Sequence, residues 1–185
     1  EKDALTSDSR ELTDEQQDQR YARIAELKSK EMQLENELSE LIEELKDQGY
    51  IKRDKGGKKK MKLAASKPMH FVSSTGADIY VGKNNRQNDY ITTTLAAKND
   101  LWFHTKNIPG SHVVVMCGGK EVSDETLIYA ATLAAENSGA AAGAQVPVDY
   151  TPIKFVKKPN GSKPGMVIYT TNKTLYVTPD NGGKL

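Results

Sequence analysis

The chain has little of what several large classes of protein require. Its 185 residues include 1 cysteine, Cys117, which excludes an internal disulfide framework and fits a reducing cytoplasm. No run approaches the roughly 18 apolar residues that a membrane-spanning helix needs, and the acidic segment 1–20 does not resemble a signal peptide. We therefore expect a cytoplasmic protein without a membrane span. The start within a charged helical pattern suggests part of a longer protein.

Motifs that commonly carry catalysis or a cofactor are also missing. The chain has no Walker A motif, no G-x-G-x-x-G and no G-x-S-x-G. Ser111 and His112 would point to opposite faces of a strand, and so would His112 and Cys117, so they form no local base–nucleophile pair. Zinc-ligand spacing is absent from the set His70, His104, His112 and Cys117. We expect no enzyme activity, no metal and no cofactor.

Charge is distributed unevenly along the chain. Residues 1–48 carry 7 Lys/Arg against 15 Asp/Glu, a net −8, whereas residues 49–185 carry 19 against 10, a net +9. An acidic arm on a basic domain is typical of a protein that binds a polyanion, and nucleic acid is the commonest polyanion. The alternative is an ordinary solvated surface.

Residues 1–49 are predicted to form a coiled-coil helix, the C-terminal part of a longer coiled coil. From Leu12 to Gln48 there is no Pro or Gly, and Gly49 is a natural residue for the helix end. An apolar stripe follows a 3-4 alternation typical of about three heptads: Ile24, Leu27, Leu34, Leu38, Leu41 and Leu45. We expect a partner helix or self-association to cover this stripe; the alternative is a helix packed on its own domain.

Residues 50–67 are predicted to be a flexible basic linker, because like charges repel and little is available to bury. It would either follow a phosphate backbone or act as a solvated hinge. Its cations are Lys52, Arg53, Lys55, Lys58, Lys59, Lys60, Lys62 and Lys67.

Residues 68–185 are predicted to form an α+β domain, a mostly antiparallel sheet with helices on one face. Strand-like runs occur at 69–73, 78–82, 101–105, 111–117, 146–156, 166–170 and 174–177. Residues 88–97 can be helical. A clear helix begins after Ser123, a good N-cap residue, and ends at Gly139.

Three segments of this domain carry candidate binding residues. Four amides and two cations fall within seven residues, which suits phosphate and base recognition or a turn that caps a helix: Lys83, Asn84, Asn85, Arg86, Gln87, Asn88 and Asp89. Strand alternation places Trp102 and His104 on one face, where they would stack a base or be half-buried. A glycine-rich loop is surrounded by Lys154, Lys157, Lys158 and Lys163, which would contact phosphate or protect an edge strand.

Taken in order, several motifs resemble the NFACT-R domain of the NFACT ribosome quality-control proteins. They are Val81–Asn85 with Gln87–Tyr90, Asp100–His104, Pro109–Val113, the Ala-rich helix, Val146–Tyr150, Lys157–Pro159 and Lys163–Gly165. Residues 10–50 resemble the end of that family's middle coiled coil.

The resemblance implies an RNA-binding module that binds tRNA and the large ribosomal subunit at stalled nascent chains. It implies RNA contact at the matching positions, which are Lys83–Asp89, Trp102, His104, Ser111, His112, Lys157, Lys158 and Lys163. Gram-positive members are also described as fibronectin- or fibrinogen-binding surface proteins, so a cell-surface adhesin is the alternative. Hydrolase chemistry by Asp89, Asp100 and His104 is a third possibility.

Overall fold

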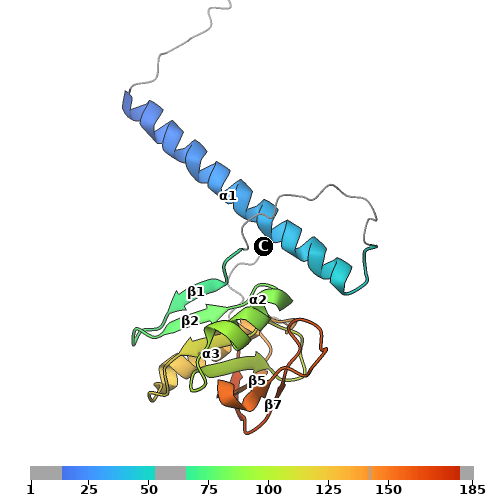
Figure 1. Ribbon diagram of the computed structural model, residues 1–185. Coiled ribbons are helices and arrows are strands. Elements are labelled where there is room, and N and C mark those ends of the chain that lie inside the picture. The colour runs from blue at the N-terminus through green and yellow to red at the C-terminus, as the bar shows by residue number, and fades with distance from the viewer. Residues whose placement is uncertain (1–13, 53–65, 142, 180–185) are drawn as a thin grey trace, which may run out of the picture. The chain divides into compact units, whose positions relative to one another are not determined.

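The computed structural model describes residues 14–52, 66–141 and 143–179 and divides into a helical unit and a larger globular unit (Figure 1). Most of the predicted linker, residues 53–65, lies outside the described residues. The boundaries predicted at 49/50 and 67/68 therefore remain predictions.

The predicted N-terminal helix is confirmed as α1, Asp14–Asp47. It ends in a Schellman motif around Gly49, whose φ is +85°: Tyr50 N–H donates to the Leu45 carbonyl at 2.9 Å and Gly49 N–H to the Lys46 carbonyl at 3.2 Å. Five stripe residues are exposed, from 38% at Ile24 to 58% at Leu38. The partner expected to cover the stripe remains a prediction.

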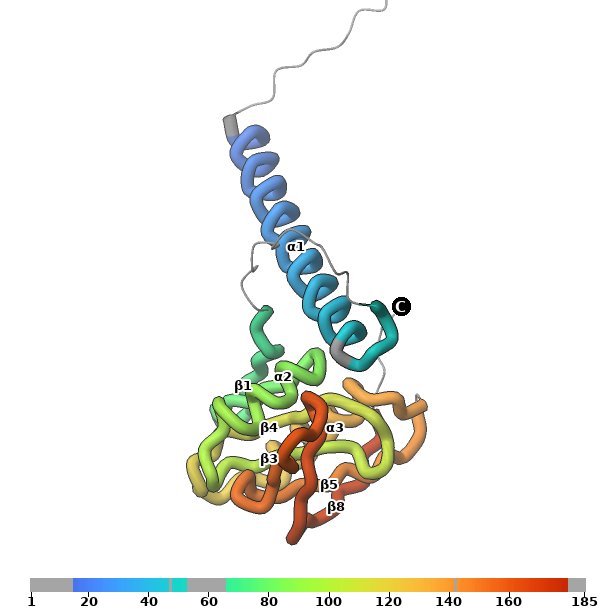
Figure 2. The backbone as a smooth tube through the Cα atoms, turned by 45° about the vertical axis from the view of Figure 1, so that its right-hand side comes forward, coloured from blue at the N-terminus to red at the C-terminus, as the bar shows by residue number. Residues whose placement is uncertain are grey.

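The globular unit is built on a six-stranded antiparallel sheet, which confirms the α+β class. Its strand order is β1-β2-β4-β3-β5-β8, followed from β1 to β8 in Figure 2. The strands are β1 (Met69–Val72), β2 (Asp78–Val81), β3 (Leu101–Thr105), β4 (Val113–Met116), β5 (Val146–Pro152) and β8 (Lys173–Val177). Every neighbouring pair in the order is antiparallel, as the short connections predict.

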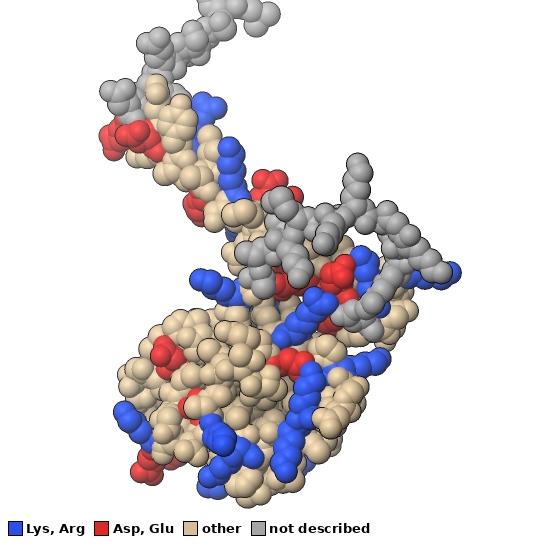
Figure 3. Space-filling view, viewed as in Figure 1, with Lys and Arg blue, Asp and Glu red and all other residues tan. Residues whose placement is uncertain are grey.

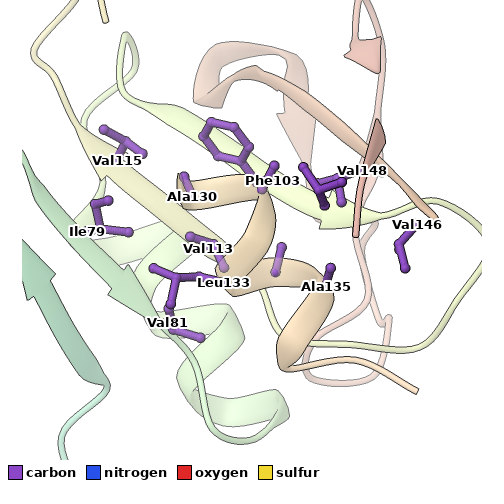
Figure 4. Close-up of a cluster of buried hydrophobic side chains, with 13 residues drawn as sticks. Ile79, Val81, Phe103, Val113, Val115, Ala130, Leu133, Ala135, Val146 and Val148 are labelled. Carbon is purple, nitrogen blue, oxygen red and sulfur yellow. The ribbon is translucent and has the colours of Figure 1, made fainter. Parts of the chain in front are cut away.

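Helix α3, Asp124–Glu136, covers one face of the sheet. Ser123 caps it as predicted, its hydroxyl accepting from Thr126 N–H at 3.3 Å. Its buried alanines lie against Phe103 and the valines of the central strands (Figure 4). Small side chains let the helix approach the sheet closely, so this side forms the main core.

The opposite face is also covered, so the expectation of helices on one face holds only for α3. This covering consists of α2 (Asn85–Tyr90), the π-helix η1 (Ile91–Leu95), the 3-10 turn η2 (Ile153–Phe155) and a small sheet of β6 (Val156–Lys157) and β7 (Ile168–Tyr169). Together with the sheet they enclose a second core around Ile91, Trp102 and Val114.

The strand predicted at 146–156 is shorter in the structure, because β5 ends at Pro152. After Pro152 the chain turns through η2, where Ile153 N–H donates to the Asp100 carbonyl at 2.9 Å. This turn directs residues 153–170 back across the sheet instead of extending β5.

Candidate nucleic-acid interface

The first half of the Asn/Lys-rich segment shapes a tight turn into α2. The Asn84 side chain accepts from Gln87 N–H at 2.9 Å, and the Gln87 side chain accepts from Lys83 N–H at 3.0 Å. This reciprocal arrangement satisfies backbone donors at the start of the helix. Gln87 is 6% exposed, so it acts in the fold, whereas the side chains of Lys83 and Arg86 are exposed.

Asn88 joins α2 to strand β4. It is 4% exposed, and its side-chain oxygen accepts from His112 N–H at 3.0 Å. Gly82 packs so closely that a Cβ there would lie 2.2 Å from the same oxygen. The imidazole of His112, itself 2% exposed, shares a 2.8 Å hydrogen bond with Thr92. Asn88 and His112, both predicted RNA contacts, are thus buried parts of the scaffold.

Asp89 connects this segment to the lysine-bearing loop. Its carboxylate forms an ion pair with Lys158 and accepts from Gly165 N–H at 2.9 Å. A Cβ on Gly165 would lie 2.4 Å from the Asn85 side-chain oxygen, so loop and helix are in close contact. Two candidate segments that lie far apart in the sequence are therefore adjacent in space.

Trp102 does not offer a surface for base stacking in this structure, because it is 0% exposed. Strand alternation did place it beside His104: the rings stack with centroids 5.7 Å apart and planes inclined by 8°. Tyr169 of β7 covers the indole, 4.8 Å between centroids. The indole Nε1 of Trp102 has no hydrogen-bond partner among the residues that the structure describes. The sequence pattern could not reveal that residues 153–170 cover this face.

The two central histidines add no positive charge near neutral pH. Burial lowers the pKa of His112 to about 3, with a further lowering from the neighbouring His104. Burial also lowers the pKa of the half-buried His104, partly offset by hydrogen bonds to the backbone and by Asp149. Burial, followed by its hydrogen bond to Asp149, raises the pKa of Tyr169 to about 12. Near neutral pH, His104, His112 and Tyr169 therefore contribute no charge to this part of the face.

Ser111 also has a structural role. It is half-buried, and its backbone N–H donates to the Asn137 carbonyl at 2.9 Å, which ties the start of β4 to the end of α3. The lysine-bearing loop differs, because Lys157, Lys158 and Lys163 are exposed.

The two sides of the sheet carry opposite charge. Residues 83–98 and 153–170, the basic layer, contain 7 Lys/Arg against 1 Asp/Glu, a net +6. Helix α3 on the other side contains no Lys/Arg and 3 Asp/Glu, a net −3. Figure 3 shows Lys and Arg side chains gathered along one visible side of the globular unit. The basic layer also includes Lys98, which the sequence motifs did not single out.

The proposed hydrolase residues do not form one cluster. Asp100 is 1% exposed and accepts from Ala97 N–H and Gly118 N–H, both at 2.7 Å. It stands four residues from His104 on β3, about 13 Å along a strand. Within the described ranges, no group of three or more His, Cys, Asp or Glu could hold a metal ion.

No helix in the described part of the chain is both long and apolar enough to cross a membrane.

A basic layer over one face of a sheet is typical of a domain that binds a polyanion such as nucleic acid. Residues 67–170 match the family described as the NFACT protein RNA binding domain. The match covers more than half of the chain, so this chain belongs to that family.

Several relatives share this part of the sequence. The chain is 48% identical over 145 residues to the Rqc2 homolog RqcH of Bacillus subtilis, covering 78% of this chain and 25% of the relative. It is 43% identical over 145 residues to the Rqc2 homolog RqcH of Streptococcus pneumoniae, covering 78% and 26%. The chain thus spans about a quarter of these relatives, and it belongs to a ribosome quality-control family.

A solved structure is similar as well. It is the C-terminal part of the fibronectin/fibrinogen-binding protein of Streptococcus suis, with 45% identity and a TM-score of 0.68, covering 78% of this chain and 57% of that one.

Proposed function

We propose that this chain is the RNA-binding module of a cytoplasmic ribosome quality-control factor, binding tRNA and the large ribosomal subunit at stalled nascent chains. It positions RNA and performs no catalysis of its own. The observation that carries this proposal is the net charge of +6 on the basic layer, set against −3 on the α3 side. Phosphate attraction dominates nucleic-acid affinity, so RNA should approach the basic layer.

The arrangement of the basic layer supports this assignment. Asp89 is its one carboxylate, and it is engaged by Lys158 and by Gly165 N–H. Lys157 and Lys163 occupy the exposed loop next to the segment that carries Lys83. Cations held on adjacent, mutually anchored loops match a curved phosphate backbone better than cations on independent segments.

Salt dependence of tRNA binding tests the proposal. If the chain neutralises about four phosphates, log Kobs should fall against log salt with a slope of roughly −3 to −4. The double variant Lys157→Gln, Lys163→Gln should reduce the slope by about 2. Lys120→Gln is the matched control, because Lys120 is an exposed lysine outside the basic layer. An affinity that is indifferent to salt would refute the proposal.

Binding to fibronectin or fibrinogen is a second candidate, favoured by the name of the similar Streptococcus suis protein. It would place the parent protein on the cell surface. The decisive comparison is fibronectin binding at physiological salt by this chain and by an unrelated domain of equal charge. Equal binding by both would assign the effect to non-specific electrostatics.

A further inference from the structure

At the β8 end, part of the sheet face opposite α3 is not covered by any of the residues that the structure describes. Tyr176 is 66% exposed there, while its neighbours Leu175 and Val177 pack into the main core on the other face. The antiparallel register pairs Tyr176 with Pro147 of β5. Lys106, which follows β3, donates its N–H to the Pro147 carbonyl at 2.8 Å. Lys106, Pro147 and Tyr176 therefore form one row across three chain segments.

A buried carboxylate with fixed hydrogen-bond partners lies next to this row. Asp149, 2% exposed, accepts from the Tyr169 hydroxyl at 2.9 Å and from the Thr174 hydroxyl at 2.5 Å. The ammonium of Lys106 lies 3.8 Å from the same carboxylate, and the Lys106 side chain is 46% exposed. Because Tyr169 belongs to β7, its hydrogen bond to Asp149 connects the row directly to the basic layer.

We infer that Tyr176 is the base-stacking residue for single-stranded RNA, with Lys106 contacting a phosphate of the same strand. This inference rests on the proposed RNA-binding function. An exposed ring on a rigid strand loses little entropy on stacking, and every base has a face to offer it. Tyr176 thus fills the role that the sequence motifs assigned to the buried Trp102.

The charge distribution favours the β8 end of this face over the β1 end as the place where RNA binds. Both ends are uncovered, but the β1 end carries Asp78, whose side chain is 53% exposed and pairs with His70. The strands β3, β5 and β8 contain a single acid, Asp149, which is buried. A phosphate chain leaving the basic layer therefore meets Lys106 and no exposed carboxylate on these strands.

The test uses a single-stranded RNA that contains 2-aminopurine, whose fluorescence is quenched by stacking. Tyr176→Ala should weaken binding by about 5- to 100-fold and abolish the quenching by protein. Tyr176→Phe should retain both properties. Tyr129→Ala is the matched control, because Tyr129 is an exposed tyrosine on α3. Circular dichroism checks that each variant is folded.

Salt dependence separates the two roles. Tyr176→Ala should leave the salt slope unchanged, whereas Lys106→Gln should make it shallower by about 0.7. If the wild-type chain binds RNA and Tyr176→Ala binds equally well, the inference is overturned and the proposed function stands. If the wild-type chain binds no RNA, both fail. Binding of an extended peptide along β8 that excludes RNA would also overturn the inference.

Discussion

Replacing Trp102 with alanine distinguishes a core residue from an RNA contact. Trp102 is 0% exposed and contacts the rings of His104, His112 and Tyr169. Deleting a buried tryptophan side chain typically costs about 3–5 kcal/mol of the free energy of unfolding. The substitution removes no hydrogen bond of the indole, because Nε1 has no partner within the described ranges. The cost therefore comes from lost packing and the cavity.

That loss is large against the roughly 5–15 kcal/mol by which whole domains are stable. Urea unfolding followed by far-ultraviolet circular dichroism measures it, since the variant has no tryptophan left to report by fluorescence. Phe103→Ala is the control: Phe103 is equally buried but faces α3. We expect both variants to lose stability on this scale and to bind tRNA normally when folded. A loss below about 1 kcal/mol combined with tenfold weaker tRNA binding would refute the argument.

Three further outcomes are expected. Gly82→Ala should lower the free energy of unfolding by about 1–3 kcal/mol in urea unfolding, because the new Cβ would meet backbone and side chain of α2. Gly139→Ala is the control and should be nearly neutral in the same assay, because no atom lies nearer than 3.7 Å to its new Cβ. The depressed pKa of His112 means that the unfolded state binds the extra proton, so stability should fall as pH drops from 6.5 towards 3, and a folded His112→Gln variant should show a shallower decline. Asp89→Asn removes the ion pair with Lys158 and makes the basic layer more positive, so tRNA should bind at least as tightly at fixed salt; weaker binding by the folded variant would make Asp89 an RNA contact.

Local signals in the sequence predicted most of the sheet and α3. Ser123 and the acidic first turn define the start of α3, and alternation defines β3, because both depend on neighbouring residues only. Alternation also placed Trp102 and His104 on the same face. It did not reveal that this face is enclosed, since enclosure depends on contacts such as Asp89 with Lys158, which are 69 residues apart.

The segment that encloses the face has weak sequence signals of its own. Its strands β6 and β7 are two residues long each, too short for a period to emerge. Residues 88–97 were predicted to be helical and contain η1, but the pattern did not show that η1 is a π-helix, which departs from the 3.6-residue period. Tyr176 was overlooked because only the tertiary register shows that its part of the sheet is uncovered.

The distribution of charge, more than its total, should govern RNA binding by the globular unit. Residues 67–179 carry 11 Lys/Arg against 8 Asp/Glu, a modest net +3. The basic layer and α3 lie on opposite sides of the sheet, separated by about two packing distances of roughly 10 Å each. Since the Debye length is about 8 Å at physiological ionic strength, the acidic side hardly weakens the field at the basic layer. A lysine removed from the basic layer should therefore change the salt slope, whereas one removed beside α3 should not.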